Sequence, residues 1–450
     1  MLGAEKIGIY NYCYSTAYLF GIFSLLGLEN YGNRSIARIP KDDLAQRSST
    51  FFSIVKMQLF SSLLVVGLYI VYFQVYGKEY KVFFALELLY LLSVGLDISW
   101  FFFGIEEFRT TAIRSGIIKL LTIIFIVTFV RGKAALVIYI IIMAGGSFCS
   151  SLVLWFFLRG KIVKIKVPLS EVKKHILPNI ILFIPVVSLA LFHYMDKVML
   201  GSLSTMAELG YYSNADKVIN IPLGVIHGLG VVMLPRISSL VEAGESATIK
   251  RLISNSIVFC MWAGSAICFG IIGLAKDFVP FFFGPGYDKC IQILAIFAPV
   301  VIIKAWSSVF RMQYLLPHGM DKEFNISLIL AALINILFNW FAIPFLNSLG
   351  AVIGTLIAEF VAAFLYTFFS KQSDIVIEGF VSAIRFLLIG ILMLVCIRIS
   401  ARIAVNLNII LRLAIEFVVG TTVYLLLSGL ILKKIYNYPI TKAIRELKKT

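Results

Sequence analysis

The stretch LGAEKIGIYNY at residues 2–12 decides how this chain is interpreted, because ELGYYSNADK at residues 208–217 repeats it in a weaker form. Three residue pairs recur at a constant spacing of 202 positions: Gly8 and Gly210, Tyr10 and Tyr212, and Arg34 and Arg236. A duplication on this scale indicates that the chain consists of two structurally related halves.

The composition indicates a membrane protein. Hydrophobic residues make up 60% of the 450 residues, charged residues only 14%, and the mean hydropathy is +0.95. Such a chain cannot cover soluble domains with polar surface, so the bilayer must be its solvent. About 13 apolar runs are long enough to cross roughly 30 Å of hydrocarbon as helices: residues 9–31, 51–75, 82–104, 115–131, 134–158, 176–200, 212–234, 253–275, 288–310, 324–346, 350–370, 382–400 and 409–432.

These runs lack the alternation of polar and apolar residues that a membrane β-barrel requires. We therefore predict an all-α, polytopic membrane fold. All six cysteines fall within these runs, with Cys290 close to the start of the run at 288–310. This pattern predicts neither a disulfide framework nor a metal site, and no motif indicates a cofactor.

The net charge is +16, and the positions of the basic residues along the chain agree with the predicted spans. Lys and Arg concentrate in alternate connections, which the positive-inside rule places in the cytoplasm. We therefore predict no nucleic-acid partner, an attraction to anionic membrane lipids and a cytoplasmic C-terminus. The basic connections are residues 34–47, 109–114, 159–174, 236–251, 311–322, 371–385 and the tail 433–449.

The duplication also predicts the organisation of the spans. In the second copy a span at 176–200 precedes Gly210, whereas almost nothing precedes Gly8 in the first. We expect that a first helix is missing; an N-terminus that genuinely lies outside is the alternative. With that helix included, the repeat predicts two parallel six-helix lobes and two extra helices, as in membrane transporters.

The predicted parts are an N-terminal lobe at 1–158, a basic cytoplasmic linker at 159–175, a C-terminal lobe at 176–370, and two further helices with a basic cytoplasmic tail at 371–450. No connection is long enough for a separate soluble domain. The connection at 235–252 is interpreted as a short surface helix.

Ionisable residues inside membrane spans are costly and usually functional. Asp216, Asn220 and His227 fall on one face of a single predicted helix, which also contains Pro222. We expect this face to line a substrate cavity, with a structural hydrogen bond between helices as the alternative.

Cationic positions suggest that the cavity binds phosphate. Lys304 and Arg311 lie on one helical stripe, and Lys119 lies on another in the first lobe. Arg34 and Arg236 occupy equivalent inner helix ends, where they either bind phosphate through bidentate hydrogen bonds or anchor the helices.

Acidic residues are candidates for ion coupling. Glu87 and Asp97 share one stripe, and Glu359 is central in its span. A carboxyl group in such surroundings can bind a proton or sodium ion, or it can pair with a neighbouring lysine. Asp196 and Lys197 are gate candidates, with an ordinary solvated helix end as the alternative.

Six segments, in their order and spacing, resemble the polysaccharide repeat-unit flippases, a branch of the multidrug, oligosaccharidyl-lipid and polysaccharide (MOP) exporter superfamily. The segments are LGAEKIGIYNY at 2–12, NYGNRSIA at 30–37, DISWFFFGIEEF at 97–108, DKVMLG at 196–201, ELGYYSNADK at 208–217 and LPRIS at 234–238. The family's first helix has no counterpart in this sequence.

The resemblance implies two six-helix bundles plus two helices in a bacterial cell membrane. It also implies alternating access that moves an undecaprenyl-pyrophosphate-linked oligosaccharide to the outer leaflet for capsule, O-antigen or exopolysaccharide assembly. A polymerase and glycosyltransferases are the implied partners, and no catalytic residue is expected.

Three alternatives stay open at this stage. A flippase for peptidoglycan lipid precursors shares the extra helix pair, and a multidrug or metabolite cation antiporter of the same superfamily shares the two lobes. A membrane polysaccharide polymerase would need a sizeable outer loop with catalytic residues, whereas the outer loops here are short. The absence of a Walker-type phosphate loop argues against nucleotide hydrolysis.

Overall fold

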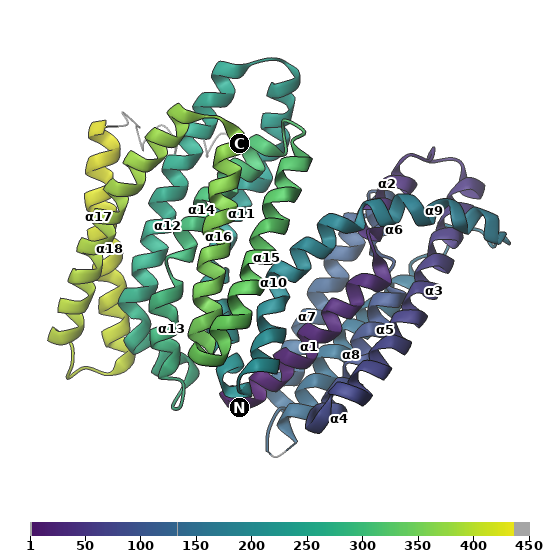
Figure 1. Ribbon diagram of the computed structural model, residues 1–450, viewed down its shortest axis with the longest axis horizontal. Helices are drawn as coiled ribbons and strands as arrows, with labels where there is room; N and C mark the ends of the chain where they lie inside the picture. Colours follow the sequence, from purple (N-terminus) through teal and green to yellow (C-terminus); the bar gives the residue numbers. More distant parts are fainter. Residues whose placement is uncertain (1, 133, 436–450) are drawn as a thin grey trace. The chain divides into compact units, whose positions relative to one another are not determined.

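The computed structural model describes residues 2–132 and 134–435, and in this part of the chain every regular element is a helix (Figure 1). The all-α prediction is therefore confirmed. The chain divides into two compact units, residues 1–210 and 211–450. The predicted lobe boundaries at 158 and 176 stay a prediction.

The first unit begins at the N-terminus and includes the basic segment that follows α8. Its elements are α1 (Ala4–Leu25), α2 (Leu28–Ala37), α3 (Leu44–Tyr76), η1 (Lys78–Tyr80), α4 (Lys81–Leu86), α5 (Leu88–Leu96), α6 (Ser99–Gly104), α7 (Phe108–Phe129), α8 (Ala135–Phe156), α9 (Leu169–Ile181) and α10 (Phe183–Leu203).

The second unit continues from the long helix that carries the second copy of the repeat. Its elements are α11 (Met206–Glu242), α12 (Ser246–Phe283), α13 (Lys289–Phe297), α14 (Val300–Phe310), the π-helical turn η2 (Arg311–Leu315), α15 (Asp321–Leu346), α16 (Ser348–Ser370), α17 (Ser373–Ile403) and α18 (Ile409–Ile435).

Each predicted span coincides with a helix or with a short series of helices. Twelve helical segments of the described residues are long and apolar enough to cross a membrane. They correspond to twelve of the 13 predicted spans, and the 22-residue α1 corresponds to the remaining one, at residues 9–31. Most of the predicted basic tail at 433–449 lies outside the described residues.

The interpretation of 235–252 as a separate surface helix is wrong. Helix α11 continues through Pro235 to Glu242, and α12 begins at Ser246 after a short turn. A proline removes one backbone donor and can kink a helix, but it does not have to end it.

The repeated glycines have a packing role in the first unit. A Cβ atom at Gly8 would overlap the carbonyl oxygen of Met206, and a Cβ atom at Gly210 would overlap the carbonyl oxygen of Ala4. The spacing of 202 positions makes Ala4 equivalent to Met206. The contact of Gly8 with Met206 is therefore equivalent to the contact of Gly210 with Ala4. The start of α1 and the start of α11 therefore cross backbone to backbone, and glycine at both positions allows this approach.

The motif around Trp100 forms part of the core of the first unit. Its aromatic residues are buried against Phe51 of α3 and the apolar residues Leu28 and Ile36 of α2. The indole Nε1 of Trp100 donates a hydrogen bond of 3.2 Å to Oε1 of Gln58. The segment at 97–108 is thus largely structural.

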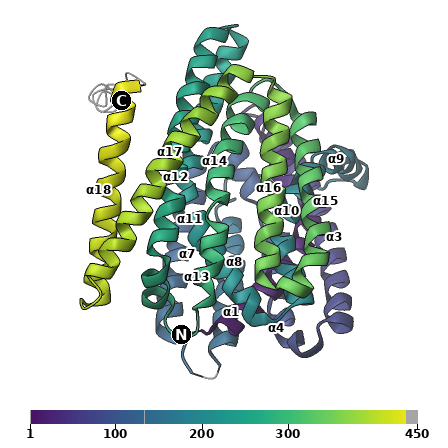
Figure 2. The ribbon, with the colours of Figure 1, turned by 60° about the vertical axis from the view of Figure 1, so that its left-hand side comes forward.

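In the second unit, α17 and α18 lie side by side, and both pack against α12. Figures 1 and 2 show them as the yellow-green and yellow helices at one edge of this unit. They correspond to the two extra helices predicted from the sequence.

Candidate functional site

A buried ion pair lies in the second unit. Nζ of Lys304, on α14, is 3.3 Å from Oε1 of Glu359, on α16. The side chains are only 13% and 8% exposed. The sequence indicated both residues as functional candidates but could not pair them.

Two more basic side chains lie near this pair. Arg311 begins the π-helical turn η2, and its charge acts on His227 of α11 and on Tyr366 of α16. The charge of Lys304 also acts on His227, and that of Glu359 on Tyr366. Of the predicted cavity residues, the structure therefore brings together His227, Lys304 and Arg311.

This group, the α14–α16 cluster, contains two cations, Lys304 and Arg311, and one carboxylate, Glu359, so its net charge is positive even when His227 is neutral. The buried Nε of Arg311 has no hydrogen-bond partner among the described residues. Short π-helical segments are frequent at functional sites. The cluster has the donors and the net charge that a phosphate group requires.

Asp216 and Asn220 lie further toward the start of α11. Nδ2 of Asn220 donates a hydrogen bond of 2.6 Å to Oδ1 of Asp216, so the two side chains form a local pair. The helical spacing places them on the same face as His227. Their role in a cavity stays a prediction.

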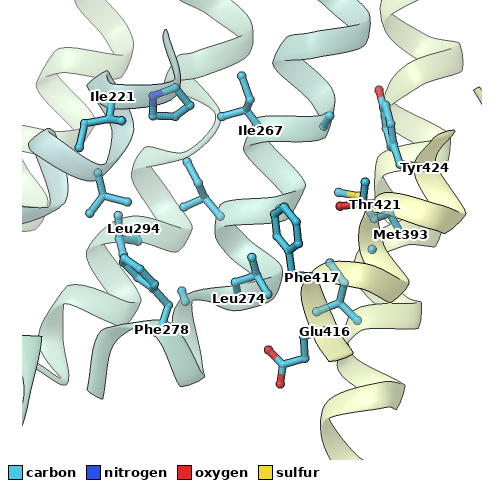
Figure 3. Close-up of a pocket in the computed structure, with 18 of the residues that line it drawn as sticks. Ile221, Ile267, Leu274, Phe278, Leu294, Met393, Glu416, Phe417, Thr421 and Tyr424 are labelled. Carbon is cyan, nitrogen blue, oxygen red and sulfur yellow. The ribbon is translucent and has the colours of Figure 1, made fainter. Parts of the chain in front are cut away.

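The second unit also contains an apolar cavity of about 760 Å³ among α11, α12, α13, α17 and α18. Figure 3 shows side chains such as Phe278, Leu294 and Phe417 converging on it, with Glu416 at one end. The sequence did not predict this cavity, because it forms only when α17 and α18 pack beside α12.

The acidic candidates of the first unit have different surroundings. Glu87 interrupts the helix between α4 and α5, is 1% exposed, and has one oxygen without a hydrogen-bond partner among the described residues. Asp97 instead lies in the break between α5 and α6, where its Oδ1 accepts hydrogen bonds from the backbone N–H and the hydroxyl of Ser99, at 2.8 and 2.5 Å.

Asp97 also lines a polar cavity of about 310 Å³ in the first unit, together with Glu29 and Arg114. Arg114 donates hydrogen bonds to the carbonyl oxygen of Ser150 at 3.0 Å and to the hydroxyl of Ser115 at 3.1 Å. Sequence reasoning treated Arg114 only as part of a basic connection. Its position at the start of an apolar run was the signal that could have identified it.

The remaining candidates lie elsewhere. Arg34, Lys119 and Arg236 are exposed, on α2, α7 and α11. Asp196 on α10 is only 2% exposed, so the alternative of a solvated helix end is wrong for it. Nζ of Lys197 lies 5.5 Å from the centre of the Tyr194 ring. The proposed roles of these residues stay predictions.

Within the described ranges, the His, Cys, Asp and Glu side chains form no group of three that could hold a metal ion. The described cysteines are all free thiols.

A family model described as "Polysaccharide biosynthesis protein" matches residues 1–241, more than half of the chain. The chain belongs to the polysaccharide biosynthesis protein family. Two curated relatives of this family member are each named "Putative O-antigen transporter". The one from Escherichia coli (strain K12) is 23% identical over 385 residues, which cover 84% of this chain and 91% of the relative. The one from Shigella dysenteriae is 22% identical over 344 residues, covering 73% and 84%.

Solved transporters share the fold of this polysaccharide biosynthesis family member. The lipid II flippase MurJ, in an inward closed conformation, superimposes with a TM-score of 0.74 at 15% identity, over 96% of this chain and 98% of its own. A MATE family multidrug resistance transporter of the MOP superfamily, in an inward-facing conformation, superimposes with a TM-score of 0.63 at 15% identity, over 83% and 94%. The protein is a multi-pass membrane protein that shares the fold of these two solved transporters.

Proposed function

We propose that this protein translocates a polyprenyl-pyrophosphate-linked oligosaccharide repeat unit from the inner to the outer leaflet of a bacterial cell membrane. The α14–α16 cluster is the observation that carries the proposal, because it places two cations and a histidine within a membrane-spanning unit. Membership of a polysaccharide biosynthesis family and the names of the two relatives support a saccharide cargo.

The two ends of such a substrate require different environments. A pyrophosphate needs cationic hydrogen-bond donors, which Lys304 and Arg311 supply, and Arg can bind it through two parallel hydrogen bonds. A polyprenyl chain needs apolar surroundings, and the 760 Å³ cavity beside α17 and α18 offers them. We assign the headgroup to the α14–α16 cluster and part of the lipid tail to the apolar cavity.

We further propose alternating access with an exchanged ion. With the cell interior negative, outward movement of each uncompensated negative charge gains about 2.3 kcal/mol per 100 mV. Cations that move with the headgroup reduce this gain. Glu359, which can release Lys304 to the substrate when it binds a proton, and Glu87 and Asp97 in the first unit are the proposed coupling residues.

Translocation in proteoliposomes tests the proposal. The probe is a fluorescent undecaprenyl-pyrophosphate oligosaccharide, and the readout is its accessibility to a membrane-impermeant quencher. We expect Lys304→Met and Arg311→Gln each to slow translocation at least about tenfold, which corresponds to about 1.4 kcal/mol of lost transition-state stabilisation. Lys304→Arg should retain most of the rate, and Lys322→Met, at an exposed position of α15, is the matched control.

Rates equal to wild type in both variants, at equal protein amounts, would exclude the cluster as the headgroup site. A second probe, the lipid-linked peptidoglycan precursor, checks the substrate class. Faster movement of that probe than of the oligosaccharide lipid would contradict a saccharide repeat unit as the cargo.

In cells, Asp216→Ala should lower surface polysaccharide if the polar face of α11 lines the path.

A further inference from the structure

Four ionisable side chains meet where α12, α17 and α18 pack together, away from the α14–α16 cluster. They are Asp277, Arg398, Arg412 and Glu416. Asp277 and Glu416 are only 6% and 0% exposed. This group is named the α12–α18 cluster, and no predicted site residue belongs to it.

Only one of the two carboxyl groups accepts a hydrogen bond from a basic side chain. Nη2 of Arg412 donates to Oδ1 of Asp277, which forms an ion pair. Nη2 of Arg398 donates to the carbonyl oxygen of Ile272 at 3.0 Å. Both carboxyl oxygens of Glu416 are buried, and no donor group of the described residues bonds to them. The Asp277 carboxyl group lies within hydrogen-bonding reach of Glu416, and two carboxyl groups can bond to each other only when one of them holds a proton.

An ionised carboxylate in this position would be costly. A buried carboxylate that no donor group solvates loses most of its hydration energy. The negative charge of Asp277 also acts on Glu416, and two neighbouring carboxylates disfavour each other's ionisation. Arg412 is already bonded to Asp277, so Asp277 is the member of the pair that keeps its charge.

We propose that Glu416 is a proton-binding site, with Asp277 as its charged neighbour. The charged groups that face it are Asp277 from α12, Arg398 from α17 and Arg412 from α18. With the proton bound, two guanidinium groups face one carboxylate, and the cluster has one net positive charge. When the proton leaves, the cluster becomes neutral.

The site is at the end of the apolar cavity. Glu416 lines this cavity, and its carboxyl group is turned away from the apolar side chains there (Figure 3). Proton exchange would therefore change the charge at one end of a cavity that is otherwise almost entirely apolar. This inference does not depend on the proposed substrate, since it concerns only the resting protein.

Infrared spectroscopy of the purified full-length chain in detergent tests the inference. At neutral pH we expect a C=O stretching band from a protonated carboxyl group that is absent in Glu416→Gln. Glu242→Gln, at an exposed position near the end of α11, is the matched control and should leave the band unchanged. Asp277→Asn should shift the frequency of the band, because it removes the neighbouring charge.

Identical carboxyl bands in wild type and Glu416→Gln would overturn the proposal, because Glu416 would then be ionised. Loss of the band when sodium replaces potassium at equal ionic strength would overturn it in favour of a metal cation. If Glu416→Gln does not fold, Asp277→Asn gives the decision, because a band from Glu416 must respond to the loss of this neighbouring charge, and an unshifted band would overturn the proposal.

Discussion

At the residue scale, replacing either Lys304 or Glu359 alone should lower the folding stability more than replacing both together. Its side chains are 13% and 8% exposed, so losing one partner leaves a nearly unsolvated charge. We expect Lys304→Met or Glu359→Leu alone to destabilise the protein by about 3 to 5 kcal/mol, and the double variant to be closer to wild type. Thermal unfolding in detergent measures these differences.

Additive losses in the double variant would show that the two residues do not act as a pair. The cycle also helps to interpret the transport experiment. A Lys304 variant that folds normally in the Glu359→Leu background, yet translocates more slowly than the Glu359→Leu variant alone, has lost a contact with substrate and not a structural ion pair.

At the scale of the elements, the crossing of α1 and α11 depends on two glycines. Any side chain at Gly8 or Gly210 overlaps a backbone carbonyl oxygen, which cannot turn aside as a flexible side chain can. We expect Gly8→Ala and Gly210→Ala each to cost at least about 1 to 3 kcal/mol of folding stability. The yield of folded protein and its thermal midpoint measure the effect.

Gly228→Ala is the control on the same long helix, because a Cβ atom there has no neighbour within 4 Å. Alanine should be neutral or stabilising by about 0.5 to 1 kcal/mol, since it lowers the backbone entropy of the unfolded chain. If Gly8→Ala and Gly228→Ala behave alike, the helices do not cross at this point.

At the scale of the whole molecule, the distribution of Lys and Arg predicts the orientation in the membrane. We expect the basic segments at 159–174 and 371–385 to be cytoplasmic and the turn between α17 and α18 to be outside. Reporter fusions measure this: green fluorescent protein after residue 174 should fluoresce, and alkaline phosphatase after residue 406 should be active. Phosphatase activity after residue 174 would invert the proposed topology and the direction of the proposed transport.

Much of the site was predictable where one helix was sufficient. The stripe of Lys304 and Arg311 follows from helical periodicity, and so does the face of Asp216, Asn220 and His227. The partner of Lys304 was not predictable, because Glu359 belongs to another helix. The hydrogen bonds from Ser99 to Asp97 depend on a break in the helix after Leu96, which an apolar run does not reveal.

The sequence alone determined the solvent and the secondary structure of this protein. Its apolar runs can satisfy their backbone hydrogen bonds in a bilayer only as helices, and its duplication predicts two related halves. Only the tertiary structure decided which charges are paired, which carboxyl groups lack a partner and where the apolar cavity lies. These properties arise between helices distant in sequence, and side-chain packing brings them together without leaving a periodic signal in any one segment.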